Sequence, residues 1–169
     1  KSGDRYSLKA DIDIALGILK NDKMNLAVQK LTEIGINKII PLKTERVVVK
    51  LDDSKEKWGI VIEEALKQCR GVKIPELCKI TKIRDINFKS YDKVFFAYEN
   101  CDESRNIFQL LDGAEKSILY IIGPEGGFTE KEADFMRSGN AVEISLGNRI
   151  YRAETAAITI GGILANVFK

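Results

Sequence analysis

Two arginines, a glutamate and a threonine occur within seven residues near the end of the chain, as Arg149, Arg152, Glu154 and Thr155. An almost wholly apolar segment, residues 158–168, follows them directly. Long charged side chains are rarely found beside such a segment unless they are paired or bind something. Guanidinium groups at this density are suited to a planar polar or anionic group, and a solvated turn with a local ion pair is the alternative interpretation.

A second candidate is the loop Gly123-Pro124-Glu125-Gly126-Gly127, which follows the apolar run of residues 117–122. It lacks the Gly-Lys-Ser/Thr ending of a P-loop and the spacing of a dinucleotide-binding loop. Glycines permit positive φ and a close approach of a ligand to the backbone, although an ordinary turn has a similar composition. Two such loops near the C-terminal ends of strands favour one ligand crevice formed by both, with Glu125 presenting a carboxylate at its mouth.

The elements that must position these loops alternate between strands and amphipathic helices. Apolar runs predict strands over residues 12–19, 38–42, 94–98, 117–122 and 141–146. Helical periodicity predicts a helix that Asn21 or Asp22 caps and Gly35 ends, and two further helices over residues 58–69 and 155–168. A capping box at Thr129 and Glu132 predicts another helix that ends near Gly139. This alternation predicts an α/β fold with a mainly parallel sheet flanked by helices.

Composition narrows the chemistry. The 169 residues are typical of one domain, and the net charge of +2 neither demands nor excludes nucleic acid. The chain has no histidine, which removes the commonest general base and zinc ligand. Cys69, Cys78 and Cys101 form no metal-binding pattern and favour a reducing compartment. Residues 155–168 are too few to span a bilayer. We therefore expect a cytoplasmic protein without a metal site or a membrane span.

The chain resembles the bacterial 16S ribosomal RNA uracil-N3 methyltransferases (RsmE type) of the SPOUT superfamily. The resemblance covers nearly the whole chain and includes residues 27–35, 41–46, 64–69 and 97–99, the Gly-Pro-Glu-Gly-Gly loop and residues 146–156. The last two segments together are highly specific. The resemblance implies a SPOUT fold with a C-terminal trefoil knot, S-adenosylmethionine as the cofactor, and a homodimer that methylates uridine N3 in 16S ribosomal RNA of the small ribosomal subunit.

The resemblance also implies roles for particular residues. Arg152 or Arg46 would stabilise negative charge on uracil O2 and O4, while Glu125 or Glu154 would take the N3 proton, unless Glu154 orients Arg152 instead. RNA contacts are expected from Arg46, Arg70, Arg149 and Arg152. Cofactor contacts are expected from Ala97, Tyr98, Glu99, Ile122, Gly123, Pro124, Glu125, Gly126, Gly127, Leu146, Gly147, Asn148, Arg149, Ile150, Tyr151 and Thr155.

The chain departs from the family pattern in three respects. Family members carry an N-terminal RNA-binding barrel of about seventy residues, so residues 1–8 would be its remnant or linker and residues 9–169 the methyltransferase domain. Arg70 and Gly71 look exchanged, and Tyr151 replaces the usual leucine.

Two alternative functions stay open at this point. One is a knotted methyltransferase that acts on tRNA or on a ribose 2′-hydroxyl, and the other is a non-catalytic RNA-binding or ribosome-assembly module. For the homodimer, the apolar face of residues 155–168 is expected at or near the interface, where Gly161 and Gly162 would permit a close approach of helices.

Overall fold

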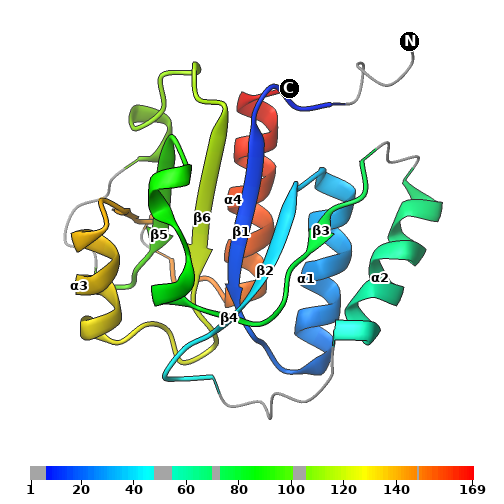
Figure 1. Ribbon diagram of the computed structural model, residues 1–169, viewed down its shortest axis with the longest axis horizontal. Helices are drawn as coiled ribbons and strands as arrows, with labels where there is room; N and C mark the ends of the chain where they lie inside the picture. The colour runs from blue at the N-terminus through cyan, green and yellow to red at the C-terminus, as the bar shows by residue number, and fades with distance from the viewer. Residues whose placement is uncertain (1–6, 48–54, 70–72, 101–105, 148) are drawn as a thin grey trace.

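The computed structural model describes residues 7–47, 55–69, 73–100, 106–147 and 149–169 (Figure 1). It confirms the predicted α/β class: a parallel sheet is flanked by helices. The elements in chain order are β1 (Asp11–Gly17), α1 (Asn21–Ile34), β2 (Lys38–Lys43), α2 (Lys55–Gln68), β3 (Glu76–Leu77), β4 (Thr81–Lys82), β5 (Lys93–Ala97), β6 (Ser117–Ile122), α3 (Glu130–Ser138), β7 (Val142–Ile144) and α4 (Ala153–Val167), with short 3₁₀ turns at Ile83–Asp85, Phe88–Ser90 and Ile107–Gln109.

The sheet has seven strands in the order β3-β2-β1-β6-β5-β7, with β4 also paired to β2, and the pairings are parallel. β1 lies at the centre between β2, the next strand along the chain, and β6, which begins opposite Asp11 at Ser117. The strand order therefore reverses at β1. In open α/β sheets, ligands bind outside the carboxyl ends of strands at such a reversal.

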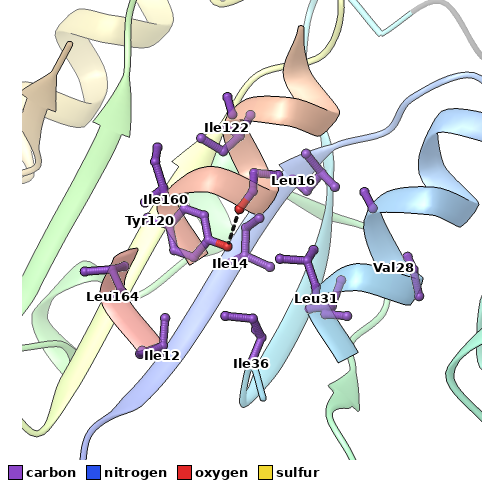
Figure 2. Close-up of a cluster of buried hydrophobic side chains, with 14 of the residues drawn as sticks. Ile12, Ile14, Leu16, Val28, Leu31, Ile36, Tyr120, Ile122, Ile160 and Leu164 are labelled. Carbon is purple, nitrogen blue, oxygen red and sulfur yellow. Dashed lines mark hydrogen bonds between the residues drawn. The ribbon is translucent and has the colours of Figure 1, made fainter. Parts of the chain in front are cut away.

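The apolar side chains of β1 and β6 alternate between two cores, one on each face of the sheet. Ile12, Ile14 and Leu16 face α1 and α4, as Figure 2 shows, while Ala15 faces the core that includes residues of α3. In Figure 1, α4 runs behind β1 and β6, α1 and α2 lie on the β2 side, and α3 lies at the β7 end. Because β1 and β6 are covered on both faces, their sequences are nearly continuous apolar runs.

Tyr120 of β6 connects the sheet to α4 inside the core that also contains Ile12, Ile14 and Leu16. Its hydroxyl donates a hydrogen bond to the Ala157 carbonyl oxygen at 2.9 Å (Figure 2), and its burial raises its pKa well above the ordinary value. A Cβ on Gly161 would lie 2.7 Å from that hydroxyl, whereas one on Gly162 would meet nothing within 4 Å. Gly161 therefore serves packing within the chain, and only Gly162 faces open space.

Local signals at the helix ends were partly right. Gly35 ends α1 with φ of 96°, and the Thr129–Glu132 capping box is present, as predicted. The predicted cap of α1 is wrong: Lys20 is the N-cap residue and its side chain makes no capping hydrogen bond. None of the described helices is long and apolar enough to cross a membrane. Among the described residues, no group of His, Cys, Asp and Glu side chains could hold a metal ion.

Candidate functional site

Three neighbouring strands end at one cavity. β5, β6 and β7 end at Ala97, Ile122 and Ile144, and all three residues line a cavity of about 620 Å³. This volume lies within the range of roughly 300–1,000 Å³ that is typical of small-molecule sites. The cavity is at the carboxyl edge of the sheet, the edge at which ligands bind in open α/β sheets, and it lies beside the reversal of strand order at β1.

Most of the residues expected at the site line this cavity. Glu125 and the three arginines Arg46, Arg149 and Arg152 do so, as do Ala97, Tyr98, Glu99, Ile122, Gly123, Pro124, Gly126, Gly127, Leu146, Gly147, Ile150 and Tyr151. Thr155 and Glu154 are described but are not among the lining residues. Asn148, Arg70 and Gly71 lie outside the described residues, as do residues 1–6 of the expected linker.

The loop after β6 is a tight turn, and its glycines are needed for different structural reasons. Gly127 has φ of 73°, and its N–H donates to the Pro124 carbonyl oxygen at 2.8 Å. Gly126 is not in the left-handed region; a Cβ there would lie 3.0 Å from the Cβ of Arg46. Gly126 is thus required by a close approach between two loops and not by positive φ.

Arg46 is held against that loop from the end of β2. Its Nη1 donates to the Gly126 carbonyl oxygen at 3.0 Å and to the Phe128 carbonyl oxygen at 3.4 Å. The neighbouring Glu45 N–H donates to Glu132 Oε2 at 3.2 Å, so the capping-box glutamate of α3 also secures the same segment. Arg46 lines the cavity, and in the described part of the chain its Nε and Nη2 form no hydrogen bond, so N–H groups of its five-donor guanidinium are left for a ligand.

Glu125 connects the loop after β6 to the start of α1. Its Oε1 accepts the Lys20 N–H at 3.0 Å, and Lys23 in the first turn of α1 also lines the cavity. A carboxylate is favoured at a helix N-terminus, because the unpaired N–H groups there carry partial positive charge. This contact explains why α1 begins without a local side-chain cap.

The second loop leads into the N-terminus of α4. Gly147 has φ of 95° and donates its N–H to Ser145 Oγ at 3.2 Å. Arg152 is the N-cap residue of α4; its side chain makes no capping hydrogen bond, and its carbonyl oxygen accepts the Ala156 N–H at 2.9 Å. The exposed arginines Arg149 and Arg152 form no ion pair with any residue in the described part of the chain. Positive charge therefore gathers at the mouth of the cavity.

Glu154 stands apart from this arrangement. It is 8% exposed, and its Oε2 has no hydrogen-bond partner among the described residues. It forms no ion pair with Arg149 or Arg152 in that part of the chain, so the structure does not contain the local ion pair of the alternative interpretation. Of the two expected proton acceptors, the structure brings only Glu125 to the cavity.

Arg137, which the sequence did not single out, supports the Tyr98 wall from behind. Its guanidinium carbon lies 5.3 Å from the centre of the Tyr98 ring. Glu143 accepts from its Nε at 3.1 Å and from its Nη2 at 3.2 Å, and Asp134 accepts from its Nη1 at 2.8 Å. The hydrogen bond to Glu143 raises the pKa of Arg137. This network fixes the ring that lines the cavity.

Sequence reasoning also missed several lining residues. Phe128, Ile144, Ser145, Ala153 and Ala156 flank the predicted loops, so a wider window would have included them. Lys23 lies on α1, about a hundred residues before the glycine-rich loops, and no local signal marks it as part of the site. Asn100 also lines the cavity, directly after the expected residues 97–99.

Comparisons with known proteins agree with this arrangement. A family model described as an RNA methyltransferase domain matches residues 7–165. The ribosomal RNA small subunit methyltransferase E of Bacillus subtilis is 32% identical over 93% of this chain and 66% of the relative. The protein of the same name from Rickettsia conorii is 37% identical over 89% of this chain and 62% of the relative. The chain thus spans less than two thirds of the length of these two relatives.

Solved structures share the fold. A methyltransferase from Legionella pneumophila, solved with the bound cofactor SAM, superposes with a TM-score of 0.83 at 30% identity, covering 94% of this chain and 66% of that one. A ribosomal RNA small subunit methyltransferase E from Neisseria gonorrhoeae, bound to S-adenosyl methionine, gives a TM-score of 0.84 at 24% identity, covering 94% of this chain and 67% of that one. The second likeness concerns the fold alone.

Proposed function

The chain belongs to the RNA methyltransferase domain family, and we propose that it transfers a methyl group from S-adenosylmethionine to N3 of a uridine in 16S ribosomal RNA. The observation that carries this proposal is the convergence of two glycine-containing loops, after β6 and β7, on one cavity whose mouth carries three arginines. The relatives named for small-subunit ribosomal RNA supply the substrate class.

The residues present fit this cofactor. The cavity has buried apolar residues at its floor, Ile122, Ile144 and Ala156, and polar groups at its rim, a combination that is typical of small-molecule sites. Gly126 leaves a narrow space between two loops, which a side chain would fill. The uncapped N-terminus of α4 favours an anionic group, such as a carboxylate. Backbone groups of residues 122–127 and 146–151, with Ala97, Tyr98 and Glu99, would hold the cofactor.

When bound, S-adenosylmethionine supplies an activated methyl group on a sulfonium, and the remaining chemistry falls to the chain. Uracil N3 becomes nucleophilic when its proton leaves, and negative charge then spreads to O2 and O4. Arg152, at the mouth of the cavity, would donate to one of these oxygens. Arg46 is oriented through its Nη1 by Gly126 and Phe128 and would donate through its remaining N–H groups.

Glu125 is the better of the two candidates for the N3 proton. It lines the cavity and is exposed, and the hydrogen bond from Lys20 occupies only its Oε1. Among the described residues its second oxygen has no hydrogen-bond partner, so it would accept a proton directly or through water. Glu154 is buried away from the cavity lining and would support the start of α4 instead.

The same proposal includes a homodimer in the cytoplasm. Among the described residues, the outer face of α4 borders an apolar groove lined by Phe108, Ile158, Thr159, Gly162, Ile163, Asn166 and Val167. Exposed apolar grooves of this kind mark interaction surfaces. A second copy on this face would cover Gly162, which has open space above it.

The decisive experiment combines small ribosomal subunits from cells without this modification, the purified chain and isotopically labelled S-adenosylmethionine. Mass spectrometry of the digested RNA should find N3-methyluridine at one position of 16S RNA. A methylated ribose 2′-hydroxyl in this RNA, or methylation of tRNA offered in a parallel reaction, would support the first alternative instead. Absence of S-adenosylmethionine binding in calorimetry would support a non-catalytic RNA-binding module.

A further inference from the structure

Two large apolar side chains are exposed at the mouth of the cavity. Ile150 is 85% exposed and Tyr151 is 38% exposed, and both line the cavity. Single exposed apolar residues are common on protein surfaces. Here two adjacent ones lie at a site between Arg149 and Arg152, on a loop positioned by a rigid sheet, which is where binding residues concentrate.

Among the aromatic residues that line the cavity, Tyr151 is the one whose ring is exposed and makes no ring–ring or cation–ring contact with the described residues. Phe128 is buried, and Tyr98 is 9% exposed with the Arg137 guanidinium 5.3 Å from its ring centre. The Tyr151 ring is therefore available to a ligand that enters from outside.

The chemistry of the proposed reaction requires such a surface. N3 lies on the Watson–Crick edge of uracil, so the target base must leave its pairing and stacking before it reaches a cavity. Unstacked RNA bases are held on aromatic side chains and guanidinium planes, with the backbone held by cationic side chains. Arg149 and Arg152 flank the exposed pair and have no ion-pair partner among the described residues. Their charge complements a polyanion.

We propose that Ile150 and Tyr151 form a stacking platform for an unpaired RNA base at the mouth of the cavity, with Arg149 contacting an adjoining phosphate. This inference rests on the proposed function, which supplies the RNA substrate. It adds that the substrate is bound as an unpaired strand and that the Tyr151 ring contributes on the RNA side of the site.

The test measures two affinities of each variant separately. The probe for RNA is a short uridine-containing strand with 2-aminopurine beside the uridine, either single or annealed to its complement. The probe for the cofactor side is S-adenosylhomocysteine in calorimetry. The variants are Tyr151→Ala, Tyr151→Phe and the matched control Phe135→Ala, which removes an exposed ring on α3 that does not line the cavity.

We expect Tyr151→Ala to weaken single-strand binding on the order of tenfold, because stacking of one base on one ring has about that effect. The single-strand affinity of Tyr151→Phe should stay within about twofold of the parent's, since stacking needs only a ring at the platform. The single-strand affinity of Phe135→Ala should match the parent's. The affinity for S-adenosylhomocysteine should fall far less than the RNA affinity in Tyr151→Ala, because both Tyr151 variants keep the backbone of residue 151, which is the part that the proposed function places at the cofactor. The annealed strand should bind more weakly than the single strand.

Several results would overturn the platform. Equal affinity for single and annealed strands would do so, and so would RNA affinity that is absent in the parent or unaffected by Tyr151→Ala. If Tyr151→Ala loses affinity for S-adenosylhomocysteine alone, the ring lies on the cofactor side of the site. If the variant changes its oligomeric state and keeps its RNA affinity, the ring lies at an interface with a second copy of the chain. Tyr151-dependent RNA binding without methyl transfer would contradict the proposed function and leave the platform in place.

Discussion

At the scale of single residues, the sequence pointed to the site because charge and glycine are concentrated in two short segments. Residue types alone could not separate Glu125 from Glu154 as a proton acceptor. The difference lies in burial and position: Glu125 lines the cavity, while Glu154 is buried in the first turn of α4 and does not. The partner of Glu125, the Lys20 N–H, is 105 residues away in sequence and has no local signal.

Arg152 should act mainly on turnover. Replacement by alanine should lower the methylation rate on the order of 10²–10³-fold and leave the affinity for S-adenosylhomocysteine nearly unchanged, because a donor to developing charge acts in the transition state. Arg152→Lys should not restore the rate, since an ammonium lacks the planar fork of donors. Arg84→Ala removes an arginine that does not line the cavity and is the control. An unchanged rate in Arg152→Ala would move this role to Arg46 or Arg149.

Gly126→Val should weaken cofactor binding without unfolding the chain. The new Cβ would lie 3.0 Å from the Cβ of Arg46, so one of the two loops must shift. Keeping the loop in place would cost about 1–3 kcal/mol of overpacking, so the loop moves and its backbone groups no longer meet the cofactor; a binding cost of the same size is roughly five- to 150-fold in affinity. Calorimetry with S-adenosylhomocysteine and circular dichroism measure the two properties. Gly59→Val in α2, where an added Cβ meets nothing within 4 Å, is the matched control. Parental affinity in Gly126→Val would remove this loop from the cofactor site.

At the scale of elements, the longer strands and helices were predictable because their periodicity extends over several residues. β3 and β4 have two residues each, too few to show any period, and the sequence analysis did not predict them. The strands predicted over residues 12–19 and 141–146 are shorter in the structure, as Asp11–Gly17 and Val142–Ile144. Ile18, Leu19 and Ala141 are buried although they lie outside these strands, so apolar character alone does not mark where a strand ends. The helix predicted from Thr155 begins at Ala153.

The contact between α4 and β6 should tolerate a methyl group at one glycine and not at its neighbour. Gly161→Ala should lower the free energy of unfolding by about 1–3 kcal/mol, because its Cβ would lie 2.7 Å from the Tyr120 hydroxyl. Gly162→Ala should be neutral or stabilising by up to about 1 kcal/mol, since alanine is the better helix former. Urea unfolding at one fixed protein concentration measures both.

Tyr120→Phe provides the check on that explanation, because it removes the hydroxyl that the new methyl group would meet. Introduced into Gly161→Ala, it should recover most of the lost stability, although by itself it removes one hydrogen bond of about 1 kcal/mol. Equal effects of alanine at both glycines would contradict this account of the packing.

At the scale of the whole molecule, the parallel sheet follows from the alternation of elements, whereas the strand order does not. Parallel strands need crossovers, and local patterns do not say on which side of β1 a later strand is added. The trefoil knot implied by the family resemblance stays a prediction, as does the homodimer. Both concern relations between distant parts of the chain, or between two chains, that no local pattern contains.

The proposed homodimer has a direct test at the groove on α4. Phe108 is 58% exposed there, so Phe108→Glu should leave the fold intact and convert a dimer into monomers at micromolar concentration, because a carboxylate is poorly accommodated in an apolar interface. Light scattering measures the molecular mass. Ile60→Glu alters a similarly exposed side chain on α2 and should leave the dimer unaffected. A monomeric parent chain would refute the dimer.

The central position of β1 has a consequence for how the chain is synthesised. β1 pairs with β2 soon after both are made, but its other neighbour, β6, emerges about a hundred residues later. At roughly 5–20 residues per second, the ribosome needs about 5 to 20 seconds to produce it. Throughout this interval one edge of an apolar strand has unpaired backbone groups, the situation in which nascent chains associate wrongly or engage chaperones. The strand that lies at the centre of the finished sheet is thus exposed to wrong association during translation.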